Sequence, residues 1–171
     1  MGNVASLAQA RSNRPHHVFA RRYVICGSMS FAPMMQRISH RLAEQEVAAV
    51  VPDDVDFAAE YGSQENYEKF KRAVSRAHIA KVRDPRTIGI IVANFDKHGI
   101  RSYVGPNTFA EIAIAFADGK RVHLFNGIPS NYADELTAWG VKDLSGNLES
   151  LVGEYHEICR LDRRQLKLPW F

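Results

Sequence analysis

Glu111 is the side chain of this sequence best placed to do chemistry. Between residues 108 and 119 only Glu111 and Asp118 are charged. Ile114 and Ala115 follow Glu111 at the three- and four-residue spacings that make neighbours on a helix, so a helix would hold this carboxylate among apolar side chains. Because an uncompensated buried charge is costly, Glu111 needs hydrogen-bond donors, a partner or a bound ligand. A carboxylate held in such a dry, rigid position can act as a nucleophile.

A capping box offers a structural explanation of the same residue. Thr108 precedes Glu111 by three residues, and in a capping box the two side chains cap the first turn of a helix reciprocally. Position in the fold favours chemistry, because this helix follows the apolar strand expected at residues 88–94. In open α/β sheets, ligands bind beside the carboxyl ends of the strands. Both interpretations of Glu111 therefore stay open at the level of the sequence.

The turn after the first expected strand is a second candidate site. It has the sequence Gly27, Ser28, Met29 and Ser30. The glycine lets the backbone approach a ligand, the serines offer hydroxyls, and the following helix start offers free amides to a phosphate or carboxylate. The turn lacks both the P-loop and the GxGxxG pattern, which argues against nucleoside triphosphate and dinucleotide ligands. A purely structural turn is the alternative.

An alternation of strands and helices positions these residues. Apolar runs predict strands at residues 23–27, 47–51, 88–94 and 121–125 and near Val141. Helical periodicity predicts helices at residues 31–45, 67–81, 108–119, 132–139 and 148–159. Repeated strand–helix units predict an α/β fold, a single doubly wound, flavodoxin-like domain with a five-stranded parallel sheet. This domain is expected over residues 22–160, with Gly27 and Glu111 at the same edge of the sheet. A basic flexible arm at residues 1–21 and a C-terminal tail at residues 161–171 are expected to flank it.

Three segments of the chain carry a family resemblance. They are ICGSM at residues 25–29, VANFDK at residues 92–97 and YVGPNTFAE at residues 103–111, followed by Gly119, Lys120 and a strand. In their order and spacing these segments resemble the nucleoside 2-deoxyribosyltransferase family, which includes the 2′-deoxynucleoside 5′-phosphate N-hydrolases. The resemblance covers residues 22–151.

The resemblance implies an enzyme that cleaves or transfers at the N-glycosidic bond of a nucleoside or nucleoside 5′-monophosphate. Glu111 matches the family's nucleophile, which attacks the anomeric carbon and displaces the base, much as in retaining glycoside hydrolysis. No cofactor and no metal are implied. The residues expected to bind the substrate are Gly27, Ser28, Met29, Asn94, Asp96, Gly105 and Asn107.

The chain departs from the family pattern in its aspartates. Members commonly carry one or two aspartates near the third strand and the loop after it, whereas this chain has Ile88, Gly89 and Gly105 in that region. A non-catalytic nucleotide-binding or regulatory module of the same fold is therefore the alternative function. The residues that could replace the family aspartates are Asp84, Asp96 and Asn107. A segment that either covers the site or forms an ordinary helix surface contains Tyr61, Tyr67, His78 and Lys81.

Composition limits the class of protein. With 171 residues, 46% of them hydrophobic, the chain suits one compact domain. Two cysteines without metal-ligand spacing indicate a reducing compartment, so we expect a cytoplasmic protein in which Cys26 is a small buried strand residue. The net charge of +3 is mild, and no motif predicts binding to polymeric nucleic acid or a membrane. A homo-oligomer is expected from a generous set of apolar side chains that includes Phe109, Phe116, Trp170 and Phe171.

Overall fold

Five parallel strands form the centre of the molecule. The computed structural model describes residues 20–53 and 62–165. Its sheet has the order β2-β1-β3-β4-β5, and each pair of neighbouring strands is parallel. This arrangement confirms the predicted flavodoxin-like α/β fold. The strands are β1 (Arg22–Cys26), β2 (Ala49–Val50), β3 (Thr87–Val92), β4 (Arg121–Leu124) and β5 (Lys142–Asp143).

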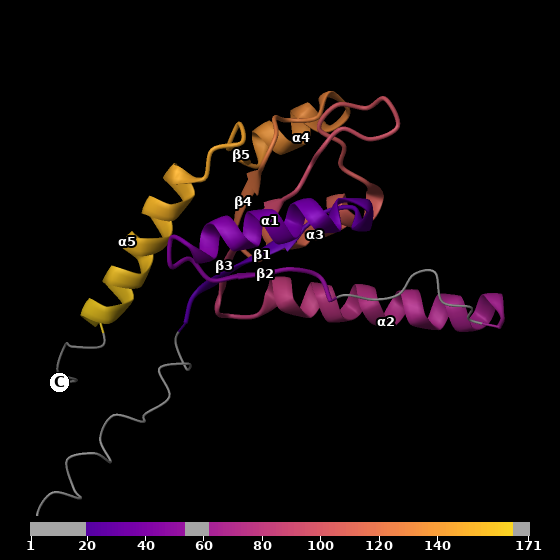
Figure 1. Cartoon of the computed structure of the whole chain (residues 1–171), viewed down its shortest axis with the longest axis horizontal. Coiled ribbons are helices and arrows are strands. Elements are labelled where there is room, and N and C mark those ends of the chain that lie inside the picture. The colour runs from indigo at the N-terminus through magenta and orange to yellow at the C-terminus, as the bar shows by residue number, and fades with distance from the viewer. Residues whose placement is uncertain (1–19, 54–61, 166–171) are drawn as a thin grey trace, which may run out of the picture.

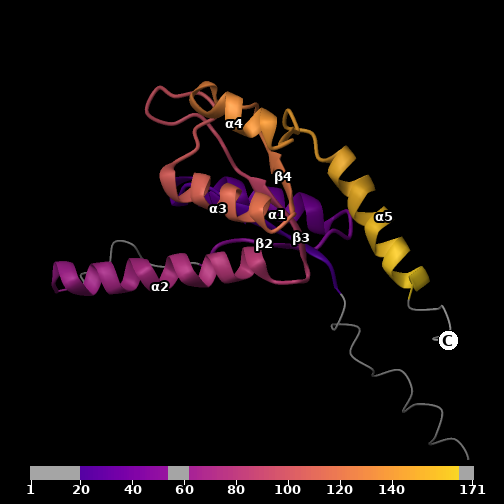
Figure 2. The same ribbon diagram turned by 180° about the vertical axis from the view of Figure 1, so that it is seen from behind.

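Helices cover both faces of the sheet (Figure 1). One hydrophobic cluster joins β1 and β3 to α1 and α5, and the other joins the opposite face of the same strands to α2, α3 and α4. Figures 1 and 2 show that the N-terminal half of α2 extends past the other described elements. The helices are α1 (Ala32–Ala43), α2 (Gln64–Arg83), α3 (Pro106–Ala117), α4 (Ala133–Ala138) and α5 (Glu149–Gln165), with short 3-10 turns η4 (Met29–Phe31) and η5 (Ser130–Tyr132).

The central strands are buried on both faces, which explains their apolar sequences. Every residue of β3 is buried, and parallel sheets with helices on both sides require this pattern. Along β1, Tyr23 and Ile25 contribute to one cluster, whereas Val24 and Cys26 contribute to the other. The prediction that Cys26 is a buried strand residue is therefore confirmed.

Several element boundaries differ from those expected. Helix α2 begins at Gln64, because the Ser63 hydroxyl accepts a hydrogen bond from the Asn66 amide and caps the helix before Tyr67. Helix α5 continues to Gln165, so the first residues of the expected C-terminal tail extend this helix. Residues 1–19 of the expected arm lie outside the described residues, as do Tyr61, Trp170 and Phe171.

The capping-box interpretation of Glu111 is wrong. Helix α3 begins at Pro106, with Gly105 as its N-cap. Proline is favoured at this first position because its fixed φ suits a helix and its missing amide hydrogen costs nothing there. Thr108 is therefore already inside the helix, buried, and is not the N-cap residue. Glu111 lies one turn further along and needs another explanation.

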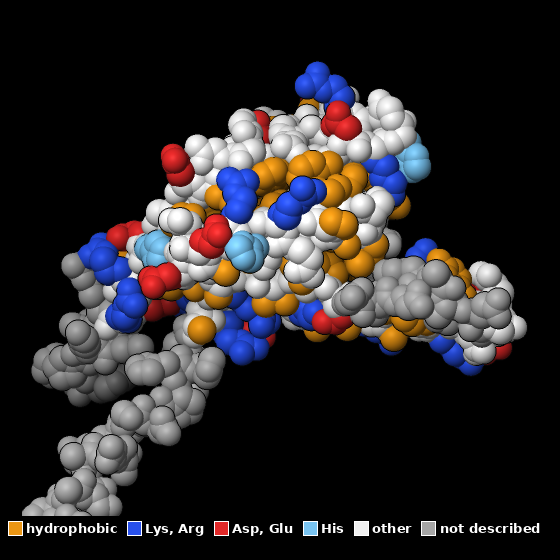
Figure 3. Space-filling model, viewed as in Figure 1, with side chains coloured by type: hydrophobic (Ala, Val, Ile, Leu, Met, Phe, Trp, Pro, Cys, Tyr) orange, Lys and Arg blue, Asp and Glu red, His pale blue; other side chains and the backbone are white. Residues whose placement is uncertain are grey.

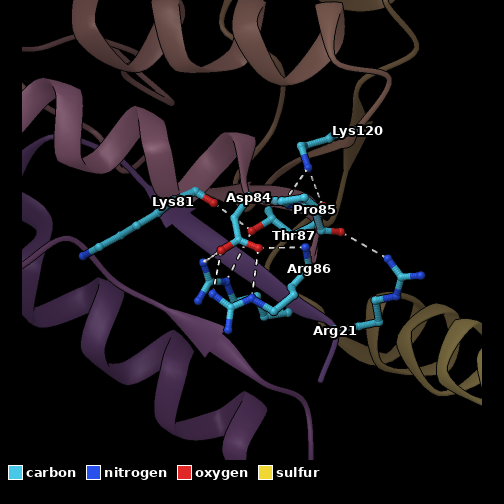
Figure 4. Close-up of polar contacts among 8 residues, drawn as sticks. Arg21, Lys81, Asp84, Pro85, Arg86, Thr87 and Lys120 are labelled. Atoms are coloured by element: carbon cyan, nitrogen blue, oxygen red, sulfur yellow. Dashed lines mark hydrogen bonds and ion pairs between the residues drawn. The ribbon is translucent and has the colours of Figure 1, made fainter. Parts of the chain in front are cut away.

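A polar network closes the amino-terminal edge of the sheet (Figure 4). The Asp84 carboxylate accepts hydrogen bonds from the Arg22 guanidinium at 3.0 Å and from Arg86 at 2.6 and 3.0 Å. The Lys120 ammonium donates to the carbonyl oxygens of Asp84 and Thr87, at 2.9 and 2.7 Å. Asp84 is one of the three residues that could replace a family aspartate, but it lies before β3, at the edge of the sheet opposite to the one that carries Glu111. Its carboxylate is engaged with two arginines there.

Replacing Asp84 by asparagine is expected to lower the free energy of unfolding by about 1 to 2 kcal/mol at pH 7. The guanidinium of Arg22, only 19% exposed, would lose a charged acceptor, while solvent screening on the Arg86 side limits the loss. The arginines hold the pKa of Asp84 well below its usual range. A carboxyl whose pKa is lowered by folding stabilises the protein above its unfolded pKa, and this contribution is lost as the pH falls. The difference in the free energy of unfolding between the wild-type and Asp84→Asn proteins should therefore shrink below about pH 4.

Urea denaturation at pH 7 and at acidic pH measures this effect. Asp118→Asn is the matched control, because Asp118 pairs at 3.0 Å with the exposed Arg83 and should contribute at most about 0.5 kcal/mol. Equal losses of stability in the two variants would contradict a special role for the Asp84 network.

Charges of both signs are interspersed on the face shown in Figure 3. A nucleic-acid groove would require a continuous basic stripe, and no such stripe crosses the described side chains of this face. Within residues 20–53 and 62–165, no helix combines the length and the apolar character needed to span a membrane.

Candidate active site

A cavity of about 260 Å³ opens at the carboxyl-terminal edge of the sheet, between the end of β1 and the helices α2 and α3. Figures 1 and 2 show these two helices running side by side. This volume is slightly below the range usual for pockets that bind drug-sized ligands, so it suits one small molecule. Its described lining comprises Gly27, Ser28, Met29, Pro52, Lys71, Val74, Ser75, His78, Tyr103, Gly105, Pro106, Asn107, Thr108 and Glu111.

Glu111 is the only acidic residue among those lining residues. Its side chain is 13% exposed, and its Oε1 atom lies 3.8 Å from His78 Nε2. The thiol of Cys26, at the end of β1, lies close to the Glu111 carboxyl group. Three elements that are distant in sequence thus bring Cys26, His78 and Glu111 together, with ligand atoms within 4.8 Å of one another.

Burial controls the ionisation of this group of side chains. It raises the pKa of Glu111 to about 7, an effect that the neighbouring Cys26 thiol partly opposes. It also lowers the pKa of His78 to about 4, and the positive charge of Lys81 adds to this shift. At neutral pH His78 is therefore uncharged, and its contact with Glu111 is not an ion pair. Burial and the nearby Glu111 raise the pKa of the Cys26 thiol.

The turn after β1 lines the other side of the cavity. Lys97 Nζ donates a hydrogen bond to Ser28 Oγ at 2.9 Å, and this hydroxyl lies 2.9 Å from Ser30 Oγ. Gly27 has a φ of 156°, and a Cβ atom there would lie 3.1 Å from the Ala93 carbonyl oxygen. A glycine therefore allows the chain to turn closely beside β3. The Ser28 hydroxyl, which Lys97 holds from the loop after β3, therefore lies where it can meet an anionic part of a ligand in the cavity.

The predicted binding residues divide into two groups. Gly27, Ser28, Met29, Gly105 and Asn107 all line the cavity with Glu111, at the same edge of the sheet as expected. Asn94 and Asp96 are not among its described lining residues, because the side chains of these two residues are hydrogen-bonded to loops at this edge.

The side chains of Asn94 and Asp96 form hydrogen bonds with backbone groups of neighbouring loops. The Asn94 amide donates to the carbonyl oxygens of Asn126 and Gly127 at 2.8 Å, and its own oxygen accepts from the Asn126 amide. The Asp96 carboxylate accepts a hydrogen bond from the Ser102 amide at 2.9 Å. Their positions after β3 are those expected, but their polar atoms face neighbouring loops and not the cavity.

The segment expected to cover the site contributes one predicted residue to its lining. His78 lines the cavity from α2, whereas Lys81 forms an ion pair with Asp53 at 2.6 Å. Tyr67 is not among the described lining residues. Sequence reasoning missed Lys71 and Tyr103, which the structure adds to the lining. Lys71 lies on α2 seven residues before His78, two helical turns away, so helical spacing could have linked these two side chains.

Comparisons of the chain with protein-family models, with curated proteins and with solved structures found no match.

Proposed function

We propose that the protein cleaves or transfers at the N-glycosidic bond of a nucleoside or nucleoside 5′-monophosphate, with Glu111 as the nucleophile. The observation that carries this proposal is the position of Glu111, a nearly buried carboxyl group lining a cavity sized for one small molecule. Its surroundings are water-poor, and such surroundings strengthen the attack of a carboxylate on a developing positive charge. The resemblance to the nucleoside 2-deoxyribosyltransferase family supports the same role.

The reaction has two displacements. An ionised oxygen of Glu111 bonds to the anomeric carbon, the electron pair of the carbon–nitrogen bond goes to the base, and the base takes a proton. Water then attacks the same carbon and loses a proton, which releases the free sugar and restores the carboxylate. When a second base takes the place of water, the sugar is transferred to it.

The donors beside Gly27 favour a substrate that carries an anion. Ser28 lines the cavity together with Glu111 and Lys71, and its hydroxyl accepts a hydrogen bond from Lys97, which is not among the described lining residues. Hydroxyl and ammonium groups bind phosphate oxygens through charge-assisted hydrogen bonds. A 5′-monophosphate would use these donors, whereas a neutral nucleoside would leave them to water.

A non-catalytic module that binds nucleotides is the second candidate. The observation that favours it is the lack of another carboxylate among the described lining residues, since family members commonly hold the sugar with aspartates. In both candidate functions a cytoplasmic protein binds a nucleoside or nucleotide in the same cavity.

Product analysis separates these two functions. The full chain is incubated with ribo- and deoxyribonucleosides and their 5′-monophosphates, and free base is quantified by chromatography. Release of base from at least one compound supports the enzyme, and faster release from monophosphates supports the role of Ser28 and Lys97. Saturable binding without base release would establish the module. A protein that neither binds any of these compounds nor releases base from them would contradict both functions.

We also expect the protein to form a homo-oligomer. Phe116 is 44% exposed and stacks on Trp139, with ring centroids 4.9 Å apart, while Phe109 stacks on Tyr132 at 4.4 Å. Phe109 and Phe116 lie on α3, and Tyr132 and Trp139 flank the two ends of α4. Burying the exposed side of this aromatic row against a second copy would remove apolar surface from water. Light scattering should give a mass of at least two chains at micromolar concentration, and Phe116→Ser should weaken the association. A monomer at that concentration would contradict this expectation.

A further inference from the structure

We propose that Cys26, His78 and Glu111 form a binding site for a zinc-like transition-metal ion. The three residues come from β1, α2 and α3, and their sulfur, nitrogen and oxygen atoms lie within 4.8 Å of one another. Their positions in sequence follow no zinc-binding spacing, which is why the sequence predicts no such site. The fold alone brings these donors together.

The imidazole of His78 points to a missing partner. Its side chain is 8% exposed, and neither ring nitrogen has a hydrogen-bond partner in the described part of the chain. Buried polar atoms are nearly always paired, so two unpaired nitrogens on one ring require an explanation. An ion bound between His78 Nε2 and Glu111 Oε1, which are 3.8 Å apart, would occupy one of them.

The donor set selects the kind of ion. A thiolate, an imidazole and a carboxylate suit zinc and similar transition metals, whereas magnesium and calcium require mainly oxygen ligands. Bonds of about 2.3 Å from zinc to sulfur and about 2.1 Å to nitrogen or oxygen place two ligands of a tetrahedral ion about 3.4 to 3.6 Å apart. The present separations, 3.8 Å between His78 Nε2 and Glu111 Oε1 and at most 4.8 Å between any two of the three ligand atoms, are slightly longer than these distances.

The site has three protein ligands and an open side. Because Glu111 and His78 both line the cavity, a fourth ligand could enter from it, as in zinc sites that keep one position for water or substrate. The nearby ammonium of Lys81 is paired with Asp53 at 2.6 Å, which offsets its repulsion of a cation.

Metal binding would regulate the proposed reaction. A carboxylate oxygen that ligates an ion cannot also bond to the anomeric carbon, so metal and nucleoside would compete for Glu111. This consequence rests on the proposed function, whereas binding of the ion does not. The metal-free protein would then be the active form.

Cobalt(II) titration of the full chain tests the binding. The background is the double variant His16→Ala, His17→Ala, which removes two adjacent histidines that lie outside the described residues. One equivalent of cobalt should bind at micromolar concentration, with the absorption band typical of a thiolate-to-cobalt bond, and zinc should displace it. Cys26→Ser should abolish the band, and His78→Gln should weaken binding at least tenfold. Cys159→Ser is the matched control and should leave the band unchanged.

Two readouts keep this inference separate from the proposed function. Cobalt binding is measured by absorbance and needs no turnover, whereas one equivalent of zinc should reduce base release at least tenfold, reversibly with a chelator. Cobalt binding in a protein that releases no base would overturn the proposed function and leave the metal site standing. No cobalt band, or a band that persists in a folded Cys26→Ser protein, would overturn the metal site.

Discussion

Replacing Glu111 by glutamine is expected to abolish the release of base, by at least about a thousandfold, while nucleotide binding persists. An amide is too weak a nucleophile to form the glycosyl ester, so the first displacement stops. Glutamine has the size of glutamate and keeps much of its hydrogen bonding, so the cavity should retain its shape. The measurement compares base release and nucleotide affinity in the two proteins.

The stability of this variant should change little, by less than about 1 kcal/mol. Gly105, and not Thr108, is the N-cap of α3, so Glu111 has no capping role to lose. Glu135→Gln, an exposed position of α4, is the matched control and should keep full activity. Full activity in a folded Glu111→Gln protein would remove Glu111 from the mechanism.

The second large effect concerns Gly89, in the middle of β3. A Cβ atom there would lie 2.6 Å from the Arg121 carbonyl oxygen, 2.9 Å from Arg121 Cβ and 3.1 Å from the Tyr23 ring. The first of these atoms belongs to the backbone of β4, which is paired with β3 and cannot move alone. Gly89→Ala should therefore lower the free energy of unfolding by about 3 kcal/mol, at the upper end of the usual cost of overpacking.

Urea denaturation measures this loss, and Gly153→Ala supplies a matched control. Gly153 lies within α5, and a Cβ atom there would meet nothing within 4 Å. Alanine should stabilise this helix by about 0.5 to 1 kcal/mol, because it has less freedom to lose on folding. Two alanine variants of equal stability would contradict the close approach of β3 and β4.

The fold was predictable because the strands and the helices have different patterns of apolar residues in the sequence. The uninterrupted apolar run that forms β3 is typical of a strand buried on both faces, and the structure buries all of its residues. Helix starts were less predictable. Pro106 and Ser63 begin α3 and α2 earlier than the apolar pattern suggests, because capping chemistry and proline geometry fix a helix start independently of periodicity.

The candidate site was predictable only in part. Parallel strands bring their carboxyl ends to one edge, which explains why Gly27 and Glu111 meet at one cavity as expected. The contact of Cys26 with Glu111 and His78 depends on how α2 packs against α3, and residue spacing carries no information about that packing. The same limit applies to Asn94, whose neighbour Asn126 is 32 residues away in sequence.

The stereochemistry of transfer tests the central claim most directly. Methanol is added to the reaction as an acceptor, and the anomeric configuration of the methyl glycoside is read by proton NMR. A nucleophilic Glu111 inverts the anomeric carbon twice, so a β-nucleoside substrate should give the β-methyl glycoside. Formation of the α-methyl glycoside would show direct attack by the acceptor and would contradict a covalent intermediate on Glu111.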